Sequence, residues 1–273
     1  MISQKEKCEE FARLHRQPAA FVIPNPWDVG SARLLQGLGF KALATTSAGF
    51  AFTLAKTDGE VTLEEKLAHC SQLAGATSIP VNADFENGFA DDPETVTENV
   101  LRVARTGVAG CSIEDFSRDS HAIYDFDLAV ERVQAAAEAL STLDMPFQLT
   151  ARAENLSRGV DDLDDTVKRL KAYEAAGADV LYAPAIASLD DLQRVTRELG
   201  KPFNVLAVFL PGATRDELAH AGAKRISVGS ALAWAALRPV IDGSKEMLEQ
   251  GTFSWTGAMT SGAEVKKYLR SLG

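Results

Sequence analysis

PETVTENVLRVARTGVAGCSIED (residues 93–115) contains one complete structural unit of this chain. Its first part is amphipathic and begins with proline, a residue that is favoured in the first turn of a helix. Gly107 follows and suits the left-handed conformation that often ends a helix. The apolar run after it predicts a strand covered on both faces. This strand ends at two acids, Glu114 and Asp115.

The same helix–turn–strand unit recurs along the chain. We expect strands at residues 21–25, 41–47, 79–84, 110–115, 147–152, 179–184, 203–208 and 225–230. The segments between them resemble residues 62–76, where apolar side chains recur at helical spacing. Eight strands that alternate with helices predict a (β/α)₈ TIM barrel. A doubly wound open sheet is the alternative, but no G-x-G-x-x-G motif follows the first strand.

We expect one barrel domain over residues 1–273, with a C-terminal helical extension from about residue 232. The net charge of −10 argues against a nucleic-acid-binding surface. The three cysteines have no CxxC spacing, which argues against a disulfide framework or a zinc site. No apolar run approaches the roughly 18 residues of a membrane span, and the N-terminus lacks an apolar signal-peptide core. These features predict a cytoplasmic protein without a membrane or nucleic-acid partner.

In a barrel of this kind, polar residues at the carboxyl ends of the strands meet at one mouth. Those ends and the turns after them contain Asn25, Asp28, Thr45, Thr46, Ser47, Asn82, Asp84, Glu86, Glu114, Asp115, Arg152, Glu154, Tyr182, Asn204, Ser227 and Ser230. Carboxylates held close together repel each other, so a cation is expected among them. Oxygen ligands without His or Cys favour Mg²⁺ or Mn²⁺. We expect Asp84, Glu86 and Glu114 to hold this ion.

Arg152 directly follows an apolar strand, and two interpretations of it stay open. A guanidinium is suited to clamping a substrate carboxylate or phosphonate, but Arg152 could instead form an internal ion pair with Glu154 or Glu114. Asp58 lies in a segment of roughly residues 48–61, which is longer than a typical connection and is expected to be mobile or functional. Residues 114–126 form a second long polar loop.

The remaining histidines and cysteines are expected to be structural. His15, His69 and His220 fall in predicted helices, and Cys111 is predicted to be a buried core thiol. Trp27 either packs near the site or closes the barrel floor.

Several motifs in combination resemble the isocitrate lyase / phosphoenolpyruvate mutase superfamily. They are IPNPWDVGSARLLQGLGFKALATTSAGFA (23–51), VNADFENGFADDPETV (81–96), GVAGCSIED (107–115) and LTARAE (149–154). The resemblance extends over about residues 20–240. It implies a Mg²⁺-dependent barrel that acts on small α-keto or α-hydroxy acids, through an enolate or, in the mutase, through transfer of a phosphoryl group.

By position, the resemblance assigns roles to individual residues. Ser47 and neighbouring backbone amides would cradle the substrate carboxylate, Arg152 would clamp its anionic group, and Asp58, Asp84 and Glu114 would bind the metal or its waters. Of these, Arg152, Asp58 and Glu114 are the expected catalytic residues. We also expect Thr46, Trp27 and Asn204 to contact the substrate. The resemblance further implies a homodimer or homotetramer with C-terminal helices exchanged between subunits.

The chain departs from the superfamily pattern at two places. Asn82 stands where many members have aspartate, and Glu86 is an additional acid that could replace the missing charge. The loop FSRDSHAIYD (116–125) lacks the catalytic cysteine of the isocitrate and methylisocitrate lyases, and also the lysine and asparagine of the mutases.

The sequence therefore favours a C–C bond-cleaving enzyme, of lyase, decarboxylase or hydrolase type. Two alternatives remain: a C–P bond enzyme, such as a phosphonomutase or phosphonopyruvate hydrolase, and a non-catalytic keto-acid sensor. The general acid stays open between Tyr124, His121 and water.

Overall fold

A parallel sheet of eight strands curves into a nearly closed barrel in the computed structural model, which describes residues 2–270. The strands are β1 (Phe21–Ile23), β2 (Leu43–Ala44), β3 (Val81–Asp84), β4 (Gly110–Glu114), β5 (Gln148–Arg152), β6 (Val180–Tyr182), β7 (Phe203–Leu206) and β8 (Ala223–Ser227). Their order is β1-β8-β7-β6-β5-β4-β3-β2. The seam between β1 and β2 is joined by a hydrogen bond from Ala44 N to Pro24 O (3.1 Å). The predicted (β/α)₈ barrel and all eight predicted strands are confirmed.

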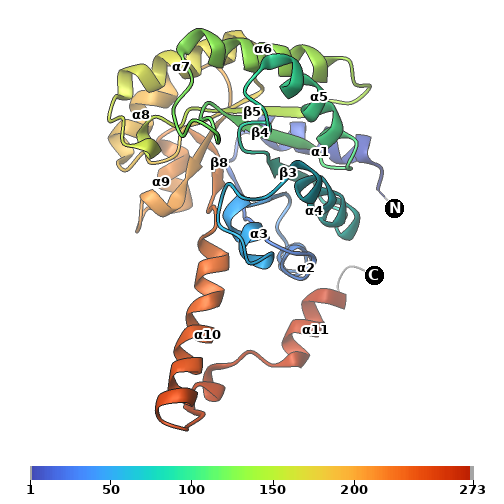
Figure 1. Cartoon of the computed structure of the whole chain (residues 1–273), viewed down its shortest axis with the longest axis vertical. Helices are drawn as coiled ribbons and strands as arrows, with labels where there is room; N and C mark the ends of the chain where they lie inside the picture. Colours follow the sequence, from blue (N-terminus) through green and yellow to red (C-terminus); the bar gives the residue numbers. More distant parts are fainter. Residues whose placement is uncertain (1, 271–273) are drawn as a thin grey trace.

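Helices surround the barrel and extend beyond it (Figure 1). They are α1 (Gln4–Arg16), α2 (Val29–Gly37), α3 (Ser47–Thr53), α4 (Leu63–Ala76), α5 (Pro93–Ala104), α6 (Phe126–Ser141), α7 (Leu163–Ala175), α8 (Leu189–Arg197), α9 (Arg215–His220), α10 (Ala231–Glu249) and α11 (Gly262–Arg270). Three short 3₁₀ helices are η1 (Leu156–Arg158), η2 (Ala207–Phe209) and η3 (Ser254–Ala258). None of the described helices combines the length and apolar character needed to cross a membrane.

The unit of residues 93–115 folds as its sequence predicts. Asp92 caps α5 by accepting a hydrogen bond from Thr95 N (2.8 Å), and Pro93 is the first helical residue. Gly107 has φ of +95°, a conformation that glycine adopts without the steric cost of a side chain. The chain then enters β4, whose five residues are all buried.

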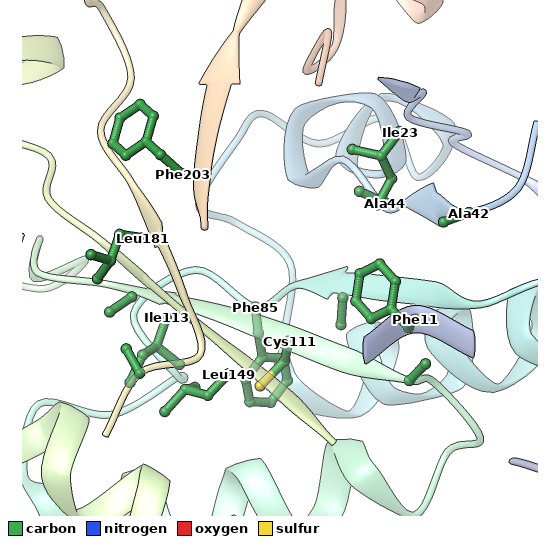
Figure 2. Close-up of a cluster of buried hydrophobic side chains, with 14 of the residues drawn as sticks. Phe11, Ile23, Ala42, Ala44, Phe85, Cys111, Ile113, Leu149, Leu181 and Phe203 are labelled. Atoms are coloured by element: carbon green, nitrogen blue, oxygen red, sulfur yellow. The ribbon is translucent and has the colours of Figure 1, made fainter. Parts of the chain in front are cut away.

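The apolar core lies between the sheet and the surrounding helices. Cys111 on β4 and Leu149 on β5 are aligned in register, and both are almost fully buried (Figure 2). Phe11 from α1 belongs to the same cluster. All three cysteines are free and buried, as the sequence predicted for Cys111.

Helix α1 covers the amino-terminal end of the barrel. Lys7 Nζ donates hydrogen bonds to Ala74 O (2.7 Å) and Thr77 O (2.6 Å), just before β3. Gln4 Nε2 donates to Ala104 O and Val108 O, just before β4. Helix α1 therefore covers part of the end of the barrel that lies opposite the carboxyl ends of the strands.

The segment of residues 48–61 is not one long loop, and this expectation was wrong for its first half. Helix α3 occupies Ser47–Thr53 and is capped by Thr46, whose Oγ1 accepts from Gly49 N (3.3 Å). The ring of Phe50 stacks on His69 of α4, with ring centroids 3.8 Å apart. This contact between distant parts of the sequence holds α3 in place.

The C-terminal segment leaves the barrel as the long helix α10, and the chain then turns back through η3 to α11 (Figure 1). Helix α11 packs against α2. Large apolar side chains on this extension are exposed, among them Val240, Leu248 and Phe253. The expected exchange of C-terminal helices between subunits stays a prediction.

His15 provides a test of how α1 is packed. It lies edge-on to Phe11 and Phe21, and burial lowers its pKa to about 3, with the nearby Arg225 charge as a further cause. In the unfolded chain the pKa is near 6.5, so protonation favours unfolding increasingly as pH falls below that value. The full stabilisation is present above about pH 6.5.

We expect the wild-type protein to lose about 2–3 kcal/mol more than His15→Phe when the pH falls from about 7 to about 4.5. Urea unfolding at the two pH values measures this difference. A parallel loss of stability in both proteins would contradict the assigned environment of His15.

Candidate active site

A cavity of about 480 Å³ lies at the carboxyl ends of the strands and extends into the barrel. Six of the residues predicted for the site line it: Thr46, Ser47, Asp58, Asp84, Arg152 and Asn204. Trp27, Glu86 and Glu114 do not line it. Most of the predicted side chains therefore lie in one place, as expected for residues at the carboxyl ends of barrel strands.

Asp84 ends β3 and is fixed from two sides. Its Oδ2 accepts a hydrogen bond from Ser47 N (3.0 Å), and its own backbone N donates to Thr45 Oγ1 (2.9 Å). The side chain is 19% exposed, and it lines the cavity. The carboxylate is therefore oriented while remaining accessible to a ligand.

Arg152 lies at the centre of three carboxylates. Its Nη1 is 3.2 Å from Glu114 Oε2 and 3.7 Å from Asp84 Oδ1, and its Nε contacts Glu154 Oε1. Glu114 and Arg152 are directly paired in the β4–β5 register, which explains their proximity. Both internal ion pairs considered from the sequence are present, and Arg152 also lines the cavity.

Arg158 adds a second positive charge to this cluster. Its Nε is 3.2 Å from Glu154 Oε2, and its Nη2 is 3.7 Å from Glu114 Oε1. Burial raises the pKa of Glu114 well above its usual value; Arg152 opposes this rise, and the nearby Glu154 and Asp84 charges add to it. The cluster is a network in which acids outnumber bases.

Glu86 faces a different group of residues. Its φ is +48°, and its Oε2 lies 3.1 Å from Arg118 Nε. Arg118 Nη2 also donates to Val61 O (2.8 Å) and to Gly59 O, next to Asp58. Burial raises the pKa of Glu86 to about 7, although the Arg118 charge opposes the rise. Glu86 thus links the turn after β3 to the loop that contains Asp58.

Three further candidates lie away from the cavity. Asp115 accepts hydrogen bonds from Arg169 Nη1 (3.1 Å) and Tyr173 Oη (2.5 Å), so it is part of the packing between β4 and α7. The hydroxyl of Tyr124 donates to Asp91 Oδ1 (2.5 Å). His121 is exposed at the tip of its loop. Neither candidate for the general acid lines the cavity.

Trp27 lies beside α3. Its backbone carbonyl is 3.0 Å from His69 Nε2, and its Cβ would be 3.1 Å from a Cβ built on Gly49. Trp27 therefore helps to position α3 and its Ser47.

Tyr182 and Arg225 are among the cavity residues that were not assigned a role from the sequence. Tyr182 was noted only as a strand end, and the Arg152 guanidinium lies over its ring at 5.1 Å. Arg225 precedes Ser227 by two residues on β8, and both side chains line the cavity. The sequence did contain a signal for Arg225. Residues i and i+2 of a strand share a face, so Arg225 could have been expected on the same face as Ser227.

Comparison with protein families identifies the chain. The profile described as phosphoenolpyruvate phosphomutase matches residues 11–248, which is most of the chain.

The chain belongs to the phosphoenolpyruvate phosphomutase family.

The names of proteins that are similar to this chain in sequence or structure are consistent with this family. A structure of a candidate lyase/mutase from Burkholderia cenocepacia has a TM-score of 0.94 and 48% identity, covering 98% of this chain and 96% of that one. The structure of 2,3-dimethylmalate lyase, a phosphoenolpyruvate mutase/isocitrate lyase superfamily member, has a TM-score of 0.86 and 26% identity, covering 99% and 95%. Oxaloacetate decarboxylase of Pseudomonas entomophila is 27% identical over 241 residues, covering 85% and 81%. The suspected superfamily is confirmed.

The family's barrel offers oxygen donors that suit a hard divalent cation. Asp84 and Asp58 line the cavity, and so does Asn82, whose buried Oδ1 has no hydrogen-bond partner. Within residues 2–270, no three His, Cys, Asp or Glu side chains form a ready metal-binding group. Mg²⁺ commonly keeps several waters and uses only one or two carboxylates, so the donor set fits this ion.

The charge network around Arg152 can be tested by stability. Arg152→Met leaves Glu114, Glu154 and Asp84 close together without their central cation, and we expect a loss of about 3–5 kcal/mol. Adding Glu154→Gln should recover part of this loss, because one negative charge is removed. Urea unfolding near neutral pH measures both effects.

A matched control is Arg102→Met, which removes an arginine from an exposed pair with Glu64. Exposed pairs contribute little, so this variant should lose less than about 1 kcal/mol. Equal losses for Arg102→Met and Arg152→Met would show that the buried network is not a stabilising one.

Proposed function

We propose that this protein is a Mg²⁺-dependent enzyme that cleaves a C–C bond in a small α-keto or α-hydroxy carboxylic acid. The observation that supports this most is the cavity in which Asp84, Asp58 and Arg152 meet. The names of the similar proteins, oxaloacetate decarboxylase and 2,3-dimethylmalate lyase, refer to acids of this class. Family membership supports an enzyme over a sensor that has lost its activity.

Asp84 and Asp58 would hold the Mg²⁺, directly or through water. Glu114 would act indirectly, through its ion pair with Arg152, and Glu86 would support the loop of Asp58. When bound, the ion would act as a Lewis acid towards negative charge that develops on the substrate's α-oxygen. This role suits a cavity whose carboxylates otherwise repel each other.

Arg152 would orient the substrate. Its Nε and Nη1 contact Glu154, Glu114 and Asp84, and its remaining nitrogen, Nη2, is available for a substrate oxygen. Thr46 and Ser47 line the adjacent wall, so the substrate carboxylate would lie between α3 and Arg152.

Tyr182 is the proposed proton donor. Burial raises the pKa of its phenol above the usual value, opposed by Arg152, so the hydroxyl keeps its proton at neutral pH. For an α-keto acid with a β-carboxylate, the bond between the β-carbon and that carboxylate breaks and CO₂ leaves. The electron pair stays on the β-carbon, next to the α-carbonyl carbon, and the β-carbon takes the Tyr182 proton. The tyrosinate then recovers a proton from solvent.

C–P bond chemistry is the second candidate, because the matching family profile is described as a phosphomutase. The loop of residues 116–125, however, closes on itself through a bridge between Phe116 and Ile123 and contains neither lysine nor asparagine. We therefore place C–C cleavage first.

Product formation from oxaloacetate, 2,3-dimethylmalate, methylisocitrate and phosphonopyruvate distinguishes these functions. We expect turnover of a C–C substrate with Mg²⁺ and its loss with a chelator. Asp84→Asn should lower kcat/KM at least about 100-fold, in line with the loss of one transition-state-stabilising group. Asp144→Asn, at a fully exposed site, is the control.

Turnover of phosphonopyruvate alone would favour the second candidate. Activity that survives both the chelator and Asp84→Asn would contradict the proposed metal role. Tight binding of the acids without any product would favour a sensor.

A further inference from the structure

A second guanidinium, that of Arg225, lies deep in the cavity. The residue is 3% exposed, and its side chain lines the cavity. Sheet register joins it to the mouth in one row, because Arg152 pairs with Tyr182, Tyr182 with Asn204, and Asn204 with Arg225. All four line the cavity. Three strand spacings, about 14 Å along the sheet, separate the two arginines.

The two arginines differ in how their charges are balanced. Arg152 has three carboxylates within 4.0 Å, whereas Arg225 has none among the side chains of residues 2–270. Burial lowers the pKa of Arg225 to about 10, so it is still charged at neutral pH. A buried charge without a partner is costly, so one that faces a cavity suggests an anionic ligand.

The hydrogen bonds of Arg225 leave one edge of its guanidinium open. Its Nε donates to Asn204 Oδ1 (2.8 Å), and Asn204 Nδ2 in turn donates to Ser227 Oγ (3.0 Å). Nη1 is buried and has no hydrogen-bond partner. Asn204 and Ser227 therefore fix the orientation of the guanidinium, and these hydrogen bonds use neither its Nη1 nor its Nη2 donors.

We propose that Arg225 forms an anion subsite at the floor of the cavity and binds the second carboxylate of a dicarboxylic substrate. Nη1 and Nη2 would each donate to one carboxylate oxygen, the bidentate arrangement for which guanidinium is suited. The inference rests on the proposed function for the position of the reacting end, which lies at the mouth near Asp84. Asn204 is then a positioning residue for Arg225.

Binding of matched acid pairs tests this subsite. Malate is compared with 2-hydroxybutyrate, and 2-oxoglutarate with 2-oxopentanoate, by calorimetry with Mg²⁺. We expect each dicarboxylate to bind wild-type protein at least about 100-fold more tightly than its monocarboxylate partner. In Arg225→Met this ratio should fall to about threefold or less, while binding of the monocarboxylates is unchanged.

Two further variants distinguish loss of the subsite from a general effect of the substitution on folding. Asn204→Asp is nearly isosteric and supplies Arg225 with an internal carboxylate, so it should also abolish the preference for dicarboxylates. This variant decides the question if Arg225→Met does not fold. Lys224→Met removes the same charge from the same strand, but Lys224 bonds to Gln17 O and Pro18 O, outside the cavity. It should retain the full preference.

Several results would overturn the inference: equal binding of paired acids by the wild-type protein, equal weakening of both acids in Arg225→Met, or an unchanged preference in Asn204→Asp. Tighter binding of 3-phosphonopropionate than of the dicarboxylates would assign the subsite to a phosphonate instead. Failure of the proposed function can be distinguished from failure of this inference. If the preference for dicarboxylates persists without Mg²⁺ and in Asp84→Asn, the subsite stands even though the proposed metal role does not.

Discussion

Repulsion between the carboxylates of Asp84, Glu114 and Glu154 is the constraint on which the arrangement of the cavity depends. Parallel strands bring these acids to neighbouring positions, where two unit charges about 4 Å apart interact by about 4 kcal/mol at an effective dielectric constant of 20. Arg152 contacts all three, and Arg158 contacts Glu114 and Glu154. The network keeps the acids oriented, and a divalent cation would offset the repulsion between them.

The resulting cavity contains two kinds of charged group. Its carboxylates lie beside Arg152 and Arg158, whereas the buried guanidinium of Arg225 has no carboxylate partner among the described residues. A ligand that complements both kinds would bind a cation at one end and present an anionic group at the other. The proposed dicarboxylate substrate with Mg²⁺ has this distribution of charge, and Tyr182 lies between the two ends in the same row of the sheet.

Local sequence features were enough to predict the barrel and most of its mouth. Continuous apolar runs predicted the strands, the glycine turns separated them from the helices, and Asp84 and Arg152 followed from their places at strand ends. Contacts between distant segments could not be predicted in this way. Helix α3 depends on the stacking of Phe50 on His69, and Glu86 is directed towards Arg118 by a left-handed backbone conformation. The lack of a carboxylate near Arg225 could not be predicted either, because it depends on the side chains that all the surrounding strands contribute.

Anomalous diffraction from crystals soaked in Mn²⁺ tests the central claim most directly. The account predicts one strong Mn²⁺ peak in the cavity, within coordination distance of an Asp84 oxygen or of a water that Asp84 holds, and no such peak in Asp84→Asn. A cavity without a peak, or a peak at another place on the barrel, would contradict it.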